Sequence, residues 1–269
     1  MSYYLLNQQR IALYPDGIPN SRFDQADISV ENQPMLYAYE LEKAKKAVLI
    51  IPGGGYARVA LQHEGEAVAQ RFQEEGCQAF VLYYRLPKKE WWHDAEYAPL
   101  EDAQRAMLLI RELYAPDSLG VVGFSAGGHI AAAVANHYDN MHIANPKGLS
   151  LKPDFSVLVY PVITMKAPLA HKGSVNNLLG EYPPAECVAY FSLEEQVTKE
   201  TPPTFLVHAK DDYVVPIAHS LVYKDSLASY DVPHASFFYE TGGHGFGLTN
   251  KTDTHLWIDD LFTWLDTLI

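Results

Sequence analysis

From residue 46 onwards, short apolar runs alternate regularly with segments of helical periodicity. Apolar runs of about four to eight residues are typical of strands that are covered on both faces. When helices separate such strands, each connection crosses back over the sheet and the strands become parallel. The pattern therefore predicts one mostly parallel sheet with helices on both of its faces.

The bounds of the expected elements follow from this pattern. Strands are predicted over residues 46–52, 78–84, 119–124, 155–160, 204–209 and 235–240. Helices are predicted over residues 64–75, 98–114, 126–138, 216–230 and 252–269. Two stretches that alternate between polar and apolar residues, 27–30 and 34–41, predict an antiparallel pair at one edge of the sheet.

Composition and charge exclude several classes of protein. Hydrophobic residues make up 48% of the chain and charged residues 20%, which argues against disorder and favours one globular domain over residues 1–269. The net charge of −13 would repel phosphate backbones and anionic lipid headgroups. We therefore expect neither nucleic-acid nor membrane binding. A homo-oligomer is compatible with the sequence, which does not specify an oligomeric state.

The cysteines and the N-terminus indicate a cytoplasmic protein. Cys77 and Cys187 lie 110 residues apart and have neither metal-ligand spacing nor the pattern of a disulfide framework. The first ten residues lack the basic start and apolar core of a signal peptide. No apolar run approaches the length of a membrane span.

Residues 161–203 interrupt the alternation with a proline-rich stretch that has little helical or strand periodicity. A long irregular insertion in a compact domain is more often functional than passive. We interpret it as a small cap over the site. The alternative is a surface excursion without a role.

A Gly-x-Ser-x-Gly pattern occurs at residues 123–127, where it follows a predicted strand and opens an alanine-rich helix. In this setting the serine hydroxyl projects above the sheet edge at a helix N-terminus, where developing negative charge is favoured. The alternative is a glycine-rich turn whose serine only caps the helix. We expect Ser125 to be a catalytic nucleophile.

A serine nucleophile needs a base, and the base needs a carboxylate that orients it. His244 lies in a glycine-rich loop directly after a predicted strand and is the expected base, whereas His208 and His129 are expected to be structural. Asp211 and Asp212 both follow the fifth predicted strand. Adjacent side chains point in different directions, so only one reaches His244, and we choose Asp212. Because neutral imidazole is the base, the rate should rise with pH as His244 titrates.

Three glycines follow the first predicted strand, within the run Pro-Gly-Gly-Gly-Tyr at residues 52–56. Glycines allow backbone N–H groups to turn toward a carbonyl oxygen and form an oxyanion hole, with the N–H of Ala126 as the second donor. The same run could cradle a phosphate, but it lacks the Lys-Ser/Thr of a P-loop.

Taken together, these residues resemble the α/β-hydrolase superfamily, and more narrowly the lipase/esterase branch that includes acetyl-xylan-esterase-like carbohydrate esterases. The resemblance covers nearly the whole chain. It rests on residues 52–56, 84–86, 100–103, 123–129, 160–162, 177–180, 212–216 and 243–246. Hormone-sensitive-lipase-like esterases carry a histidine before the glycine run, where this chain has Pro52, and that departure favours the carbohydrate-esterase-like branch.

The resemblance implies an α/β-hydrolase fold with a small cap insertion, and a mechanism that needs neither a cofactor nor a metal. It implies these roles: nucleophile Ser125, base His244, acid Asp212, and oxyanion donors Gly54, Gly55 and Ala126. Arg85 and Asp102 are landmarks of the family that we interpret as a buried ion pair.

The substrate is less constrained by the sequence. Trp91 and Trp92 lie in an aromatic loop after a strand and could stack on sugar rings, or could instead pack the loop onto the body. With Tyr56, they are the expected substrate contacts. We expect a serine carboxylesterase for short-chain acetyl esters, a small-molecule substrate such as an acetylated oligosaccharide. The alternatives are an arylformamidase or other small-amide hydrolase, and a catalytically silent binding protein.

Overall fold

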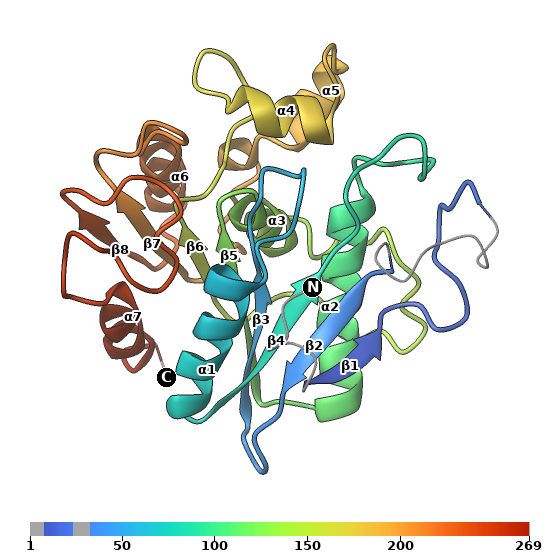
Figure 1. The fold of residues 1–269 in the computed structure, drawn as a ribbon, viewed down its shortest axis with the longest axis horizontal. Helices are drawn as coiled ribbons and strands as arrows, with labels where there is room; N and C mark the ends of the chain where they lie inside the picture. The colour runs from blue at the N-terminus through green and yellow to red at the C-terminus, as the bar shows by residue number, and fades with distance from the viewer. Residues whose placement is uncertain (1–7, 24–32, 269) are drawn as a thin grey trace.

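The computed structural model describes residues 8–23 and 33–268 (Figure 1). Within them, eight strands form one sheet in the order β1-β2-β4-β3-β5-β6-β7-β8. The strands are β1 (Gln9–Ala12), β2 (Met35–Tyr39), β3 (Lys46–Ile51), β4 (Cys77–Tyr83), β5 (Ser118–Phe124), β6 (Ser156–Val159), β7 (Thr204–Ala209) and β8 (His234–Tyr239). From β4 to β8 all neighbours are parallel, whereas β1, β2 and β4 pair antiparallel. The predicted mostly parallel sheet is confirmed.

Alternate side chains of each central strand pack into different layers. In β3, Ala47, Leu49 and Ile51 join the core beneath α2, α3 and α6, while Val48 and Ile50 join the core beneath α1 and α7. Because successive side chains enter different cores, residues 47–51 of the strand are all apolar, and only Lys46 at its start is exposed. The helices are α1 (Ala67–Glu74), α2 (Ala98–Tyr114), α3 (Ala126–Asn136), α6 (Ala218–Ser229) and α7 (Trp257–Leu265).

Two element bounds differ from the expectation in informative ways. The helix predicted over residues 64–75 is divided into a π-helical turn, η4 (Gln62–Glu66), and the α-helix α1. Residues 34–41 contain the predicted edge strand, β2, which pairs antiparallel with β1. Residues 27–30, its predicted partner, lie outside the described residues. In the part of the chain that the structure describes, no helix combines the length and apolar character that a bilayer span requires.

The order of the strands creates a switch point beside β3. The chain passes from β3 to β4 on one side and then returns to place β5 on the other side of β3. In open α/β sheets, ligands bind at the carboxyl ends of strands at such a point. The glycine run after β3 and Ser125 after β5 therefore meet at this position.

The segment from residue 161 to residue 203 lies between β6 and β7. It contains α4 (Lys172–Leu178), α5 (Ala185–Tyr190) and the 3₁₀ turn η5 (Leu193–Glu195). In Figure 1, α4 and α5 stand above the carboxyl ends of the central strands, apart from the helices that cover the sheet. The insertion thus lies over the edge at which the predicted site residues gather.

Candidate active site

Ser125 lies at a sharp turn between β5 and α3. Its backbone has φ 53° and ψ −119°, a conformation that costs energy for a non-glycine residue. Gly123 and Gly127 make the turn possible, because neighbouring backbone lies too close to them to leave room for a side chain. A Cβ atom at Gly123 would lie 2.3 Å from the carbonyl oxygen of Gly127, and one at Gly127 would lie 2.1 Å from that of Ile51. The strained turn therefore holds the hydroxyl at the carboxyl edge of the sheet.

The three predicted triad residues form one chain of hydrogen bonds. Ser125 Oγ lies 2.9 Å from His244 Nε2, and His244 Nδ1 lies 2.6 Å from Asp212 Oδ2. An ionised carboxylate only accepts hydrogen bonds, so the imidazole proton is on Nδ1. The lone pair of Nε2 then faces the serine hydroxyl. This is the tautomer that a general base requires.

The Asp212 carboxylate is buried and has partners on both oxygens. Oδ1 accepts hydrogen bonds from the backbone amides of Val214 and Val215, each at 2.9 Å. Oδ2 faces His244 and also lies 3.3 Å from Nε2 of His208. Burial alone would raise the pKa of Asp212, but the nearby His208, the hydrogen bond from His244 and the amide of Val215 outweigh burial and hold that pKa below its usual range. The acid therefore stays ionised in the folded protein.

His208 is structural, as expected, but its contact with the acid was not foreseen. Its Nε2–H donates to the carbonyl of Val215 at 2.9 Å, and Nδ1 lies 2.8 Å from the hydroxyl of Ser220. The neighbouring Asp211 has a separate partner, since its Oδ1 accepts from the amide of Gly243 at 2.8 Å. The choice between the two carboxylates thus agrees with the geometry.

The glycine run presents backbone amides beside the serine. The amide of Gly53 donates to Glu64 Oε2 at 2.8 Å. Among the described residues, no hydrogen bond uses the amides of Gly54, Gly55 or Ala126. Gly54 (φ 129°) and Gly55 (φ 63°) adopt conformations that favour glycine. Binding of an oxyanion by these three amides stays a prediction.

The structure contradicts the expected substrate contact of Tyr56. Its side chain is 3% exposed, and its hydroxyl lies 2.6 Å from Nδ1 of His129. Nε2 of that buried histidine lies 2.8 Å from the carbonyl of Phe191. Tyr56 therefore packs in the core, where it joins the glycine run to α3 instead of facing a ligand.

The expected substrate contact of Trp92 is also wrong. Its side chain is 2% exposed, its Nε1–H donates to the carbonyl of Leu86, and its ring packs against the guanidinium of Arg85. The packing alternative therefore holds, because a tryptophan without exposed surface cannot stack on a sugar. Trp91 is half-buried beneath Lys88. Its contact with substrate stays a prediction.

The inserted segment brings residues to the site to which the sequence alone assigned no role. The side-chain amide of Asn177, in α4, donates to the carbonyl of Gly55 at 2.8 Å. His171 caps the same helix, and its Nδ1 accepts a hydrogen bond from the amide of Ser174. Burial lowers the pKa of His171. Irregular segments carry no periodicity from which these contacts could be foreseen.

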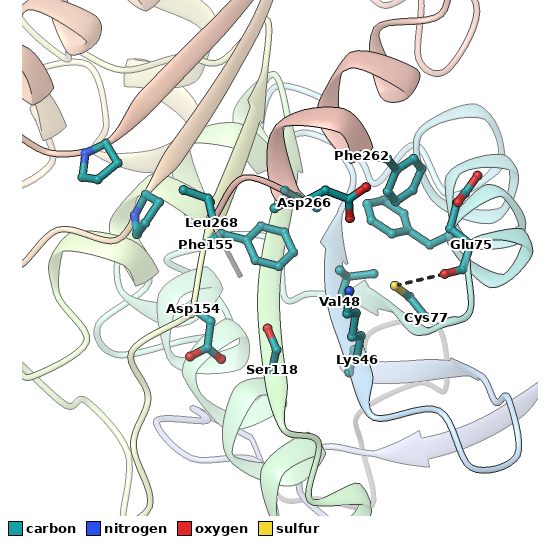
Figure 2. Close-up of a pocket in the computed structure, with 15 residues that line it drawn as sticks. Lys46, Val48, Glu75, Cys77, Ser118, Asp154, Phe155, Phe262, Asp266 and Leu268 are labelled. Atoms are coloured by element: carbon teal, nitrogen blue, oxygen red, sulfur yellow. Dashed lines mark hydrogen bonds between the residues drawn. The ribbon is translucent and has the colours of Figure 1, made fainter.

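Other features of the molecule lie away from this chemistry. In the described ranges, no group of three His, Cys, Asp or Glu side chains is arranged to hold a metal ion. A pocket of about 560 Å³ lies at the amino ends of the strands. Figure 2 shows the residues that line it, among them Lys46, Cys77 and Ser118. Because β5 has seven residues, that end lies about 23 Å from Ser125. The pocket is separate from the candidate active site.

Comparisons with known proteins agree on one family. The BD-FAE family model matches residues 36–227. Endo-1,4-beta-xylanase B of Butyrivibrio fibrisolvens is 38% identical over 228 residues, which are 81% of this chain and 35% of that protein. Acetylxylan esterase of Xylanibacter ruminicola is 30% identical over 233 residues, 83% of this chain and 46% of that protein. The chain thus spans less than half the length of either curated relative.

A solved structure extends the similarity over nearly the whole chain. The crystal structure of an acetyl ester-xyloside bifunctional hydrolase from Caldicellulosiruptor lactoaceticus is 36% identical, with a TM-score of 0.83. The match covers 97% of this chain and 96% of that one. The α/β-hydrolase fold expected from the sequence is confirmed.

Proposed function

This chain belongs to the BD-FAE family, and we propose that it is a serine carboxylesterase that removes acetyl groups from sugars or oligosaccharides. One observation carries the proposal. A strained serine, a histidine in the tautomer of a base and a buried carboxylate form one hydrogen-bonded chain beside three open amides. That combination is what acyl transfer to serine requires.

In the first step, Ser125 Oγ attacks the ester carbonyl carbon while its proton passes to His244 Nε2. The 2.9 Å distance between these atoms supports this direct transfer. The imidazole then carries a positive charge, which the ionised Asp212 stabilises through the 2.6 Å hydrogen bond to Nδ1. The carbonyl oxygen becomes negative and is bound by the amides of Ala126 and of Gly54 or Gly55.

In the second step, the tetrahedral intermediate collapses. The bond to the alcohol oxygen breaks, His244 returns its proton to that oxygen, and the acyl group remains on Ser125. A water molecule then attacks the acyl carbon while His244 takes its proton. The bond from that carbon to Ser125 Oγ breaks, His244 returns the proton to Oγ, and the carboxylic acid leaves. Each oriented oxyanion donor contributes about 2.7–4 kcal/mol to stabilising the transition state.

The substrate class is inferred from the relatives. The names of the Xylanibacter and Caldicellulosiruptor proteins describe acetylxylan and acetyl ester hydrolysis, and the latter is similar over nearly its full length. We extend this class to the present chain. Residues 161–203 act as a small cap, an assignment supported by the hydrogen bond from Asn177 to Gly55.

The test is a hydrolysis series from p-nitrophenyl acetate to the octanoate, run beside an acetylated xylo-oligosaccharide and an aryl formamide. Ser125→Ala is the blank, because it keeps the fold and removes the nucleophile. Preference for acetate, with acetate released from the sugar, supports a carbohydrate deacetylase.

Other outcomes would redirect the assignment. Turnover of model esters without release from the sugar would refute the substrate class while leaving the esterase mechanism intact. Turnover of the formamide alone would favour an amide hydrolase. No turnover of any substrate, together with no labelling of Ser125 by a fluorophosphonate, would refute the assignment of this chain as an enzyme and favour a binding protein.

A further inference from the structure

Glu64 is a buried acid that the proposed reaction does not use. It lies in the π-helical turn η4, and it is 3% exposed. Burying a carboxylate is costly unless hydrogen bonds replace its water. His63 Nε2 is 3.7 Å from Oε1, but that side chain is more than half exposed, so this contact contributes little. The carboxylate must therefore be held by its hydrogen bonds.

The first of these bonds comes from the glycine run. Glu64 Oε2 accepts from the amide of Gly53 at 2.8 Å. Gly53 lies close to both the carboxylate and the nucleophile, because a Cβ atom at this position would be 2.9 Å from Glu64 Oε2 and 2.9 Å from Ser125 Cβ. The carboxylate thus fixes the first peptide of the run against the nucleophile. The amides of Gly54 and Gly55 follow directly from this anchored position.

The second bond leads to the loop that carries His244. Glu64 Oε1 lies 2.9 Å from the hydroxyl of Tyr160, which in turn lies 2.9 Å from the amide nitrogen of Gly247. Burial and the charge of Glu64 raise the pKa of Tyr160, so the hydroxyl stays protonated. It must donate to the carboxylate and accept from Gly247. The ring of Tyr160 also packs against the imidazole of His244, with 4.8 Å between centroids.

The local backbone explains how one side chain reaches both loops. The amide of Glu66 bonds to the carbonyl of Leu61, five residues earlier, at 2.9 Å. Such π turns are rare and often occur at functional sites. The histidine loop abuts this turn, since a Cβ atom at Gly247 would lie 2.6 Å from the carbonyl oxygen of His63.

We propose that Glu64 is a positioning residue that aligns the oxyanion amides and the His244 loop at the same time. The inference rests on the proposed function, because it assigns a role within that mechanism. Glu64 touches neither substrate nor the reacting atoms, and it acts through Gly53 and Tyr160.

The isosteric change Glu64→Gln tests this role through the direction of its hydrogen bonds. Both groups that face the carboxylate are donors, and a glutamine offers only one oxygen. Its NH₂ group must face either the amide of Gly53 or the hydroxyl of Tyr160. With the oxygen on Gly53, the Tyr160 hydroxyl must accept from both the NH₂ group and the amide of Gly247, and it loses the acceptor for its own proton. With the oxygen on Tyr160, two donors oppose each other at Gly53. One of the two anchors is therefore weakened whichever way the side chain turns. Misplacing a catalytic group by about 1 Å can cost about 100-fold in rate.

The experiment compares Glu64→Gln and Tyr160→Phe with the wild type, and Glu66→Gln is the matched control from the same turn. Active sites are titrated with a fluorophosphonate, and kcat and KM for p-nitrophenyl acetate are given per titrated site. This separates poorer alignment from a smaller folded fraction. We expect Glu64→Gln to lower kcat about 10- to 100-fold, with KM within about twofold. Tyr160→Phe removes the hydroxyl that joins Glu64 to Gly247, and it should also lower kcat with KM nearly unchanged.

The outcomes separate the inference from the proposed function. If both variants keep the wild-type kcat per titrated site, Glu64 is merely structural and the inference fails. If Glu64→Gln does not fold, Tyr160→Phe decides: a lowered kcat supports the inference and an unchanged one refutes it. A wild-type chain that neither hydrolyses esters nor labels refutes the proposed function, and this inference with it.

Discussion

Asp212→Asn tests the proposed mechanism at its most defined point. Oδ1 of the carboxylate accepts two backbone amides, so the asparagine oxygen must take this position to avoid opposing two donors. The NH₂ group then replaces Oδ2 and faces His244 Nδ1. A donor at this position forces the imidazole proton onto Nε2. Nε2 can then no longer accept the proton of Ser125.

The magnitude follows from this change of tautomer. The same substitution in a serine protease triad lowers kcat by about 10⁴-fold, with the geometry intact. A loss of that size is about 5.4 kcal/mol of transition-state stabilisation. Asp211→Asn is the matched control, because an asparagine oxygen can still accept the hydrogen bond from Gly243. We expect the control to lose no more than a few-fold.

The assay is kcat/KM for p-nitrophenyl acetate, with folding of each variant checked by its thermal unfolding midpoint. If folded Asp212→Asn keeps more than a tenth of the wild-type activity, the tautomer argument is wrong. If Asp211→Asn loses the larger share, the acid must be reassigned to that residue.

Three further predictions concern stability and the aromatic loop. Burial lowers the pKa of His129 to about 4, so the unfolded chain binds more protons between about pH 4 and 6.5. The contribution of His129 to the free energy of unfolding should therefore fall by up to about 3 kcal/mol as pH drops through this window, and urea unfolding of His129→Gln should show a flatter pH dependence than the wild type. Asp102 pairs with Arg85 in the core, so Asp102→Ala should lower the free energy of unfolding by about 3–5 kcal/mol, also measured in urea. Trp92→Ala should cost about 3–5 kcal/mol through lost packing, whereas Trp91→Ala should leave the melting temperature nearly unchanged; equal losses of stability would contradict the difference in burial.

Features tied to the ends of strands could be predicted from the sequence. Ser125, Asp212 and His244 each follow a strand whose apolar run is plain, and parallel strands bring their carboxyl ends to one edge. Their loops therefore had to meet. The hydrogen bonds that join them are those of the predicted triad, but the catalytic roles stay predictions until the variants are measured.

Features that depend on the direction of a side chain could not be predicted. Tyr56 and Trp92 were expected to face substrate because of their place after strands, yet both point into the core. Neighbouring tertiary contacts decide such directions, and no local pattern encodes them. The same holds for Glu64, which stood in a predicted helix as an ordinary charged residue. Its burial follows from a π turn that sequence periodicity does not show.

The site is assembled from loops, and cross-loop hydrogen bonds determine how accurately its parts are aligned. Four glycine backbone groups around the triad are each held by a side chain from another segment. The pairs are Gly53 with Glu64, Gly55 with Asn177, Gly243 with Asp211, and Gly247 with Tyr160. Glycine has no side chain that could anchor its own loop, so alignment must come from these partners. Removing a partner should therefore raise the activation free energy of the reaction, seen as a lower kcat, by more than it lowers the free energy of unfolding. Truncating a core residue of the sheet, such as Leu49, should mainly lower the free energy of unfolding and change kcat little. The reason is that the loops at the carboxyl edge are supported by all the strands together.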